Sequence, residues 1–525
     1  MSRKDGLIVL MIFALTFILR LALLPVIEND PIFKFPIVDS LEFNKWAVEI
    51  LNGQILWDTL QNHTPLYAYF LAGIYFLIGY NPPAAVLFQY LLASLGNVLI
   101  FYIARKTTNT PIAIISTIFM AMYWFFLYIQ SFLYGENLSL IFNILLISVL
   151  IFLKDGCFKY GLGGVLFGLS IICRPDILLF AILIFFWILN NPYSWPTRIK
   201  HFGLFSLFWL LIITPVILRN YGISKEFPIL RTQVGANFYL GNNPEFKGTI
   251  IHVKIGKDWE DFISMPHNYY KRNVSETESN KFYFSETLRI IQQRPREWTN
   301  LMASKILSLL TGREFLRSED VYFYGRYMAS SPFSWISTRL IFILGVLGIF
   351  ISFSKNRDRI LLYLIILSNT PIIFFQIKTR YFMPIMPFLI IFASLAIFKL
   401  YHYLKTRNWT KALLSLCLLA ILNFLSLANP LQLTTPTVYE TYYAIAKNFQ
   451  SIKSYASAEH YYLRAIQGDP LNLSALNDYG VLLLHNREYT KALTYFEKAL
   501  QIDPHAIKPN LNLRLCQELI AKQQK

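Results

Sequence analysis

Charged residues are scarce in this sequence of 525 residues. Only 15% of them are Asp, Glu, Lys or Arg, whereas 55% are hydrophobic and the mean hydropathy is +0.43. Soluble globular proteins average about 25% charged residues. One core cannot bury this many apolar side chains, so a soluble protein is excluded over most of the chain and lipid must surround much of it.

Cysteine is rare as well, and the short motifs of common enzyme classes are missing. The four cysteines, Cys157, Cys173, Cys417 and Cys516, form no CxxC pair, so neither a zinc site nor a disulfide framework is predicted. No P-loop, GxSxG, HExxH or DxD pattern stands in a credible context. The net charge of +17 does not indicate a nucleic-acid partner, because the basic residues stand in short loops between apolar runs, where they set membrane topology.

Eleven apolar runs of membrane length predict a polytopic, all-α transmembrane bundle. The run at the N-terminus follows Arg3 and Lys4 and lacks a small-residue cleavage site, so we interpret it as an uncleaved first helix. The runs around Arg174-Pro175-Asp176 are short for full spans, and an uncharged run over 64–80 is ambiguous. The predicted spans are 6–26, 84–104, 111–127, 138–153, 160–173, 177–189, 202–218, 335–353, 360–375, 383–400 and 413–427.

If residues 64–80 lie in or on the outer leaflet and do not span the membrane, positive charge is concentrated in alternate loops. The short loops on the other face then hold only Arg174, Lys378 and Arg380. If 64–80 did span, every later loop would flip and the bias would invert. We therefore expect a cytoplasmic N-terminus and an outside C-terminus. The basic residues of the predicted cytoplasmic loops are Arg105, Lys106, Lys154, Lys159, Arg198, Lys200, Lys355, Arg357, Arg359, Lys405, Arg407 and Lys411.

Two long outside segments and a separate C-terminal domain follow from this topology. The membrane domain covers residues 1–429, with a first outside loop at 27–83 and a second at 219–334. Both loops are too long to be simple connectors, and long loops are usually functional.

The region 436–525 changes character to amphipathic helices with a 34-residue period, which is typical of tetratricopeptide repeats. We expect repeats at 439–472 and 473–506 and a capping helix at 507–522. The second copy has the small residues, the aromatic residue and the closing proline of this repeat: Gly480, Ala492, Phe496, Ala499 and Pro504. The positions that recur after 34 residues are Tyr442, Ala446, Phe449, Ala458, Tyr462, Ala465 and Pro470.

Polar residues that share the outer face are the candidate functional groups. Each has a plainer explanation: Asp39 as the N-cap of a helix beginning at Ser40, Glu136 as a solvated residue at the end of a span, and Lys378 and Arg380 as interfacial anchors. Together, acids in one loop and guanidinium groups in others suit an anionic lipid headgroup that meets a nucleophile in need of a base. The candidates are Asp39 and Glu136 for catalysis, and Arg380, Lys378, His63, Arg219, Arg174 and Glu42 for substrate binding, with no metal ligands.

Five segments between residues 6 and 427 resemble one family. They are PIVDSLEFNKWAVEILNG, HTPLYAYFLAGIYFLIGY, GLSIICRPDILL, TPVILRNYGISKEFPILRTQVGANFYLGNNPEFKG and TRYFMPIMPF. The chain resembles the membrane glycosyltransferases of fold type C, in the superfamily of protein O-mannosyltransferases and lipid A aminoarabinose transferases (glycosyltransferase family 39-like). Arg219-Asn220-Tyr221 with Gly241-Asn242-Asn243-Pro244 is the most specific piece and is similar to bacterial members, which implies a location in the plasma or inner membrane. The repeat-bearing tail is similar to that of a eukaryotic group of mannosyltransferases.

The resemblance implies inverting transfer of a sugar from a polyprenyl-phosphate donor to an acceptor hydroxyl outside the membrane, without a nucleotide, redox or metal cofactor. Asp39 matches the family's catalytic aspartate, and His63-Thr64-Pro65-Leu66 matches its His-Pro-Pro-Leu motif, with Thr64 for the first proline. Ser40 stands where a second acid is frequent, which leaves the acceptor open. The leaving phosphate would be stabilised by Arg380 with Lys378, and by Arg219 or Arg174.

Three other functions compete with this prediction. An O-antigen ligase or polymerase can also carry tetratricopeptide repeats, but normally places its main catalytic loop late in the chain. A transporter would favour an internal repeat between membrane halves, and the sequence has none. A non-catalytic scaffold would only display the repeats. We favour the glycosyltransferase, acting on a protein or glycan acceptor that the repeats recruit. The alternative role of the repeats is only to pack on the outside loop at 219–334 or to join two copies of the enzyme.

Overall fold

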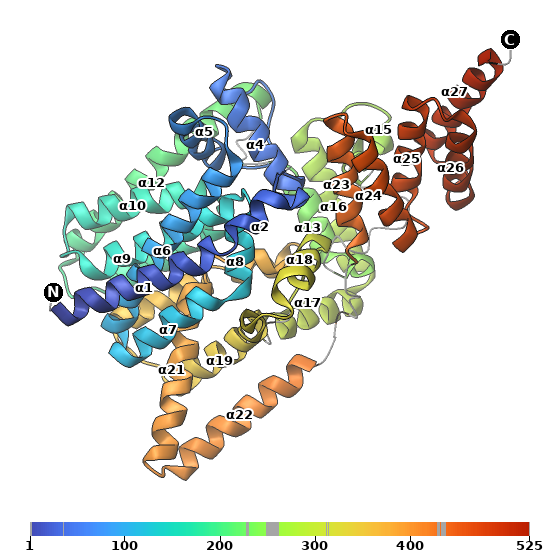
Figure 1. Cartoon of the computed structure of the whole chain (residues 1–525). Helices are drawn as coiled ribbons and strands as arrows, with labels where there is room; N and C mark the ends of the chain where they lie inside the picture. The colour runs from blue at the N-terminus through green and yellow to red at the C-terminus, as the bar shows by residue number, and fades with distance from the viewer. Residues whose placement is uncertain are drawn as a thin grey trace.

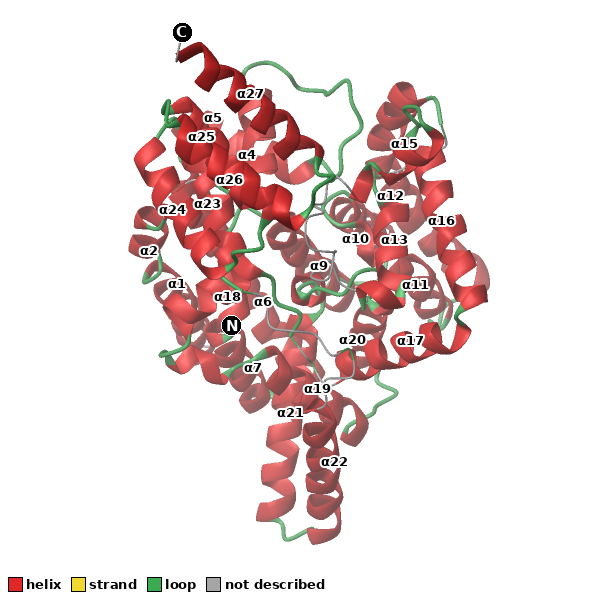
Figure 2. Cartoon of the chain, turned by 90° about the vertical axis from the view of Figure 1, so that its right-hand side faces the viewer, coloured by secondary structure: helices red, strands yellow, loops and turns green. Residues whose placement is uncertain are grey.

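The computed structural model describes residues 3–34, 36–226, 230, 232–247, 262–310, 312, 314–427, 431 and 437–523. Every regular element among these residues is a helix, which confirms the predicted fold class (Figure 2). A bundle of apolar helices forms most of the molecule, and the C-terminal helices project from it (Figure 1). The predicted domain boundaries at 429 and 436 lie outside the described residues.

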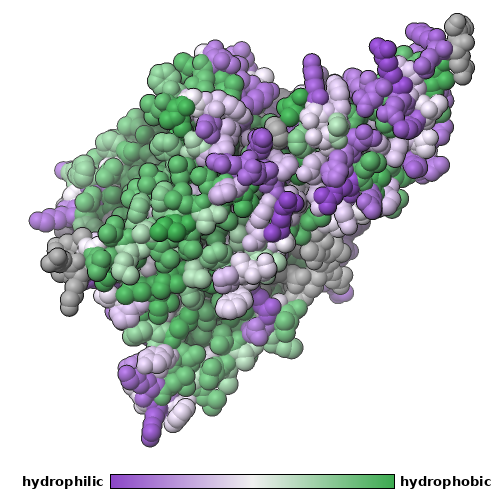
Figure 3. Space-filling view, viewed as in Figure 1, coloured by the Kyte–Doolittle hydropathy of each residue, from purple (hydrophilic) through white to green (hydrophobic). Residues whose placement is uncertain are grey.

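Within the described part of the chain, seven helical segments are long and apolar enough to cross a membrane. On the face that Figure 3 shows, apolar residues cover much of the bundle, whereas hydrophilic ones gather over the C-terminal helices. The segments are Asp5–Asn29, formed by α1 (Arg3–Leu21) and α2 (Leu24–Asn29), α6 (Pro82–Thr107), α9 (Gly135–Phe152), α12 (Trp195–Ser224), Pro332–Ile351 with η5 (Pro332–Trp335) and α19 (Thr338–Ile351), α21 (Met386–Lys405) and α22 (Trp409–Leu427).

The other predicted spans are helical but bent or short. An eighth span is formed if α7 (Thr110–Met122) and α8 (Trp124–Ser131), which meet at 50°, count as one. The remaining short helices are α10 (Cys157–Ile171), η1 (Pro175–Leu178) with α11 (Leu179–Leu189), and α20 (Arg357–Leu367). The 15 residues of α10 reach only about 22 Å, less than the ~30 Å of the hydrocarbon core. The count of eleven spans therefore stays a prediction.

The two predicted outside segments are folded and lie against each other. Asp30 of the first segment is buried and accepts hydrogen bonds from the Tyr322 and Tyr327 hydroxyls of the second. The first segment contains α3 (Pro31–Lys34), α4 (Val38–Leu51) and α5 (Leu66–Ile78). The second contains α13 (Val234–Asn242), η2 (Pro244–Phe246), α15 (Met265–Tyr270), α16 (Glu276–Gln293), α17 (Pro295–Leu310), α18 (Ser318–Phe323) and η4 (Tyr324–Met328).

The C-terminal helices form the two predicted repeats and their cap. Gly480 is required where the helices of the second repeat meet, since a Cβ there would lie 2.6 Å from the Phe496 ring. Pro470 and Pro504 each follow the end of a repeat's second helix. The helices are α23 (Tyr439–Ser451), α24 (Tyr455–Gly468), α25 (Leu473–His485), α26 (Tyr489–Ile502) and the cap α27 (Ile507–Gln523).

Two buried amides fix the chain just before α9. Gln89 of α6 donates to the carbonyls of Gln130 and Phe132, each at 3.1 Å, and Asn137 donates to Phe132 at 3.0 Å. These bonds satisfy carbonyls at the end of α8 that have no partner within the helix. They thereby place Tyr134 and Glu136 at one end of the bundle.

Candidate active site

Asp39 and Arg380 form an ion pair between the first outside segment and η7 (Thr379–Phe382). Asp39 lies in the first turn of α4, whose N-cap is Ile37, so Asp39 is not an N-cap as the plainer interpretation had it. Its Oδ2 lies 2.5 Å from Nη1 of Arg380, whose side chain is 7% exposed. Arg380 is therefore buried in the protein and is not an interfacial anchor.

Glu136 shares the same guanidinium. It stands in the first turn of α9 and is only 4% exposed, so it is not a solvated residue at the end of a span. Its Oε1 lies 3.4 Å from Nε of Arg380 and 2.5 Å from Nη1 of Arg174. Arg174 also pairs with Asp176. Arg380 thus bridges two carboxylates that come from different parts of the chain.

Two tyrosine rings separate three guanidinium groups, which we call the guanidinium row: Arg174, Arg380 and Arg317. Tyr381 lies 4.6 Å from Arg174 and 5.5 Å from Arg380. Tyr134 lies 5.4 Å from Arg380 and 5.9 Å from Arg317, which donates a 3.0 Å hydrogen bond to its hydroxyl. The rings hold the cations close together through cation–π contacts. Arg317 was missed from the sequence.

His63 lies beside Asp39 and links it to Glu42. Its Nε2 is 3.8 Å from Asp39 Oδ1 and 3.4 Å from Glu42 Oε2, and its ring packs 5.0 Å from Phe43. The next residue, Thr64, donates a 2.7 Å hydrogen bond to the carbonyl of Cys173, directly before Arg174. The His-Thr-Pro-Leu motif therefore joins the first outside segment to the Arg174 turn.

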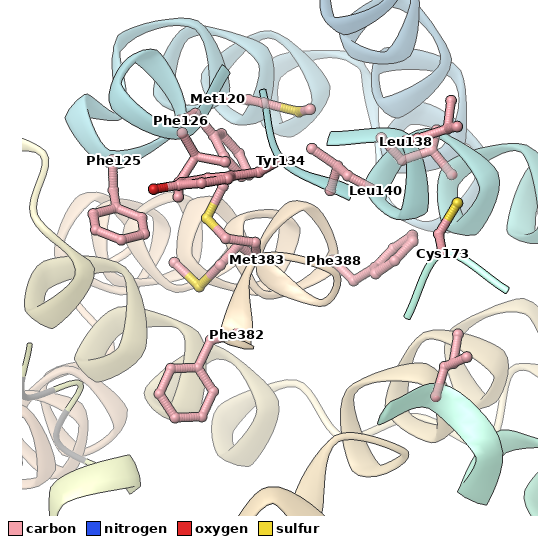
Figure 4. Packing of buried hydrophobic residues seen from close by; sticks show 14 of the residues in the cluster. Met120, Phe125, Phe126, Tyr134, Leu138, Leu140, Cys173, Phe382, Met383 and Phe388 are labelled. Carbon is pink, nitrogen blue, oxygen red and sulfur yellow. The ribbon is translucent and has the colours of Figure 1, made fainter. Parts of the chain in front are cut away.

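Some of these groups, among them Asp39, His63, Glu136 and Arg174, line one pocket at the end of the bundle. Its walls come from α4, from the His63 loop, from the start of α9 and from the turn that carries Arg174. Tyr134, which contacts Arg380, belongs to the main hydrophobic core together with Met383, Phe382 and Phe388 (Figure 4). The lining residues are Asp39, Phe43, His63, Thr64, Gly135, Glu136, Cys173, Arg174 and Pro175.

The charges of the site keep Asp39 ionised. Burial alone would raise the pKa of Asp39, but the positive charge of Arg380, followed by those of His63, Arg317 and Lys378, outweighs it and holds the pKa well below its usual range. The pKa of Glu42 is instead raised by burial, a shift that the nearby charge of Asp39 reinforces. The two acids beside His63 therefore differ in protonation behaviour.

Lys378 adds a positive charge that no carboxylate neutralises directly. Among the described residues, no carboxylate oxygen lies within 4.0 Å of its Nζ, which stands 5.8 Å from the Tyr381 ring. Burial lowers the pKa of Lys378, and the charges of Arg380 and Arg317 act in the same direction. A cation of this kind beside the guanidinium row favours an anionic ligand.

Arg219, also expected at the substrate, lies in a neighbouring pocket that shares only His63 with the first. Its Nη2 donates to the carbonyls of Trp57, at 2.5 Å, and Thr59, at 2.8 Å. Arg219 therefore fixes the loop that leads to His63. It does not join the guanidinium row.

The Gly-Asn-Asn-Pro motif anchors the segment before Lys378. A Cβ on Gly241 would lie 2.5 Å from the backbone carbon of Phe375, so only glycine allows this approach. Asn242 donates to the Phe374 carbonyl at 2.8 Å, and the ammonium of buried Lys305 donates to the carbonyls of Gly241 and Phe375. The motif thus holds η6 (Thr370–Phe374) and, through it, the chain that carries Arg380.

Metal ligation was not predicted, and the described residues hold no group of three or more His, Cys, Asp or Glu side chains suited to a metal ion. The expectation that the reaction needs no metal stays a prediction.

Two family models match the chain. That of the dolichyl-phosphate-mannose-protein mannosyltransferases matches residues 62–218, and that of a tetratricopeptide repeat matches residues 443–507. The first confirms the resemblance to membrane glycosyltransferases of fold type C, and the second confirms the repeat domain. No curated protein matches the sequence.

Solved structures of two integral membrane enzymes show a distant likeness. The archaeal oligosaccharyltransferase AglB from Archaeoglobus fulgidus, solved with an inhibitory peptide and a dolichol-phosphate, is 13% identical with a TM-score of 0.43 over 88% of this chain and 60% of its own. ArnT from Cupriavidus metallidurans, solved with undecaprenyl phosphate, is 13% identical with a TM-score of 0.32 over 74% of this chain and 78% of its own. This chain thus spans about three fifths of the length of the archaeal enzyme.

Proposed function

We propose that this integral membrane protein is a glycosyltransferase that moves a sugar from a polyprenyl-phosphate donor to an acceptor hydroxyl, with inversion at the anomeric carbon. The observation that carries the proposal is an ionised carboxylate, Asp39, which lines a pocket with Arg174 and pairs with Arg380, while Lys378 stands beside the same guanidinium row. A base and an anion site close to each other are the two requirements of this reaction.

In the proposed reaction the acceptor oxygen forms a bond to the anomeric carbon while the bond from that carbon to the phosphate oxygen breaks. The hydroxyl proton passes to Asp39. The bonding electrons leave with the polyprenyl phosphate, which gains one negative charge that Arg380, Lys378 and Arg317 stabilise.

Donor binding also activates the base in this scheme. Arg380 holds the pKa of Asp39 low in the free protein, and a carboxylate with so low a pKa is a weak base. A donor phosphate would compete with Asp39 for the same guanidinium. The pKa of Asp39 would then rise when the donor is bound, so that proton transfer becomes favourable only with substrate in place.

The acceptor is proposed to be a protein. The repeat domain supports this, since such repeats form grooves for peptides and helices, and α25 to α27 extend away from the bundle (Figure 1). A second repeat that holds the acceptor raises its local concentration without touching the chemistry. A chain that ends after Leu471 keeps the first repeat in place and is expected to show a raised KM for the native acceptor with an unchanged kcat. An unchanged KM in a folded truncated protein would refute recruitment.

The proposed activity is tested with purified protein in lipid nanodiscs and a panel of labelled polyprenyl-phosphate hexoses and pentoses. We expect release of polyprenyl phosphate together with a glycosylated acceptor whose anomeric configuration is opposite to that of the donor. Retained configuration would contradict the single displacement, and no release from any donor would contradict the function. Mass analysis of the glycans lost on deletion of the gene identifies the sugar and the acceptor.

A further inference from the structure

The first tetratricopeptide repeat lies directly against the segment that leads to Asp39. Nδ2 of Asn448, on α23, donates a 2.9 Å hydrogen bond to the carbonyl of Pro36. Pro36 is buried, and only Ile37 and Val38 separate it from Asp39. A side chain of the repeat domain therefore fixes the backbone three residues before the proposed base.

The backbone at this point is strained. Val38 has a φ of +52°, which is unfavourable for a β-branched residue because its Cβ crowds the backbone. Such a conformation persists only where surrounding contacts hold it. Asn448 supplies one of these contacts, so the first repeat helps to keep Asp39 turned toward Arg380.

The same repeat contacts the helix that follows Arg317. Arg317 is the N-cap of α18, and Tyr322 of that helix meets the ring of Tyr442 edge-on at 6.1 Å. On its other side Tyr322 donates a 3.0 Å hydrogen bond to buried Asp30. Arg464 of α24 lies 4.5 Å over the Tyr442 ring. Helix α18 is thus held between the first outside segment and the first repeat.

The two repeats differ in what they contact. Val438, the N-cap of α23, and Tyr442 and Ala444 within α23 pack against the main core of the membrane domain. Cys516, Phe496 and Leu483, from the cap and second repeat, belong to a separate core within the repeat domain. The first repeat therefore touches both Pro36 and α18, the two segments that place Asp39 and Arg317.

We propose that the first repeat is part of the catalytic apparatus, with Asn448 as a positioning residue for Asp39 and Tyr442 as one for Arg317. This inference rests on the proposed function of Asp39. It assigns separate tasks within one domain: the first repeat sets the rate of transfer, and the second repeat remains available to bind a partner.

The kinetic test compares Asn448→Ala with Asn512→Ala. The control removes a similar hydrogen bond, from Nδ2 of Asn512 to Asn477 at 2.9 Å, within the repeat domain but in its cap. We expect Asn448→Ala to lower kcat about three- to tenfold, the limit set by one hydrogen bond, with little change in KM for donor or acceptor. Asn512→Ala is expected to leave kcat unchanged. Equal kcat values for the two variants would overturn the proposal.

A rescue experiment separates positioning from general stability. Glycine adopts positive φ without strain, and Val38 is 42% exposed, so Val38→Gly removes strain at a small packing cost. The double variant Val38→Gly/Asn448→Ala is expected to recover most of the kcat lost in Asn448→Ala. A further loss in the double variant would show that the Pro36 contact does not act through the Val38 backbone.

Hydrogen–deuterium exchange gives a readout that does not depend on transfer. Asn448→Ala is expected to speed exchange of the amides of residues 37–43, whereas Asn512→Ala is not. If the wild-type protein transfers no sugar but the exchange differs as expected, the proposed function fails and the structural coupling stands. Unchanged exchange in Asn448→Ala refutes the coupling itself.

Discussion

Replacing Arg380 by glutamine removes the cation that two carboxylates share. Asp39 loses its 2.5 Å partner, while Glu136 keeps Arg174 at 2.5 Å. Removing one member of a buried ion pair typically destabilises a protein by about 3–5 kcal/mol. The Asp39 side chain is 17% exposed and Glu136 remains paired, so we expect a loss near the lower end of this range.

The effect of Arg380→Gln on catalysis is expected to exceed its effect on folding. Loss of one preorganised donor to developing charge typically costs about 10²- to 10³-fold in rate. We expect that loss in kcat/KM for the lipid donor. Arg380→Lys should recover only part of it, because lysine lacks the planar fork that binds two oxygens.

Arg380→Gln is also expected to change the pH dependence of kcat/KM in one direction. With Arg380 present, the pKa of Asp39 lies well below its usual range, so the base stays ionised under mildly acidic conditions. Without Arg380, burial raises the pKa of Asp39, and the acid limb of kcat/KM moves to higher pH. The depressed pKa of Asp39 also stabilises the fold. This stabilisation is present above the unfolded pKa of about 3.9 and is lost as pH falls through the folded value, and it becomes smaller without Arg380.

The assay is transfer from a defined polyprenyl-phosphate sugar in nanodiscs across the pH range, with thermal unfolding measured in parallel. Arg339→Gln serves as the matched control, because Arg339 bonds to Asn423 and stands outside the pocket. The role of Arg380 would be refuted if Arg380→Gln matched Arg339→Gln in donor affinity, in kcat/KM and in the position of the acid limb.

Two further predictions concern the fold. Gly241→Ala forces a Cβ against the backbone of Phe375 and is expected to destabilise the protein by about 1–3 kcal/mol, measured as a lower Tm. Gly222→Ala is the control: Gly222 lies in α12 with open space around it, so this change is expected to be neutral or slightly stabilising. Equal Tm values for the two would show that the close approach does not exist. The topology is tested with a single cysteine in place of Lys106 or Lys281 in an otherwise cysteine-free chain. We expect an impermeant reagent to label intact cells at position 281 only, and labelling at position 106 only would show the opposite orientation.

Hydropathy and repeat spacing predicted most of the architecture because both depend on local sequence. Each apolar run became helix, and the 34-residue period placed α23 to α26 within a few residues. The shortness of α10 and α11 was already visible in the apolar runs around Arg174-Pro175-Asp176, but the bend at Tyr123 could not be predicted, since apolar composition does not report where a helix breaks.

The sequence predicted only those site residues that the charge count places together on the outer membrane face. Asp39, Glu136, Arg174 and Arg380 carry charge beside apolar runs, which made them visible, and the structure brings them together. Arg317 stands within a long polar segment and has no such signal. Arg219 looked equivalent to Arg174 in sequence, but carbonyl groups of the His63 loop occupy its guanidinium, and only tertiary structure reveals them.

The most direct test of the central claim is the transfer rate of Asp39→Asn, since asparagine keeps the shape of the side chain but cannot accept the proton. Asp58→Asn, an exposed acid of the same outside segment, is the control. We predict that Asp39→Asn lowers kcat by about 10²-fold or more, with the donor still bound and Tm close to that of the control. Retention of more than about a tenth of the wild-type kcat would contradict the assignment of Asp39 as the base.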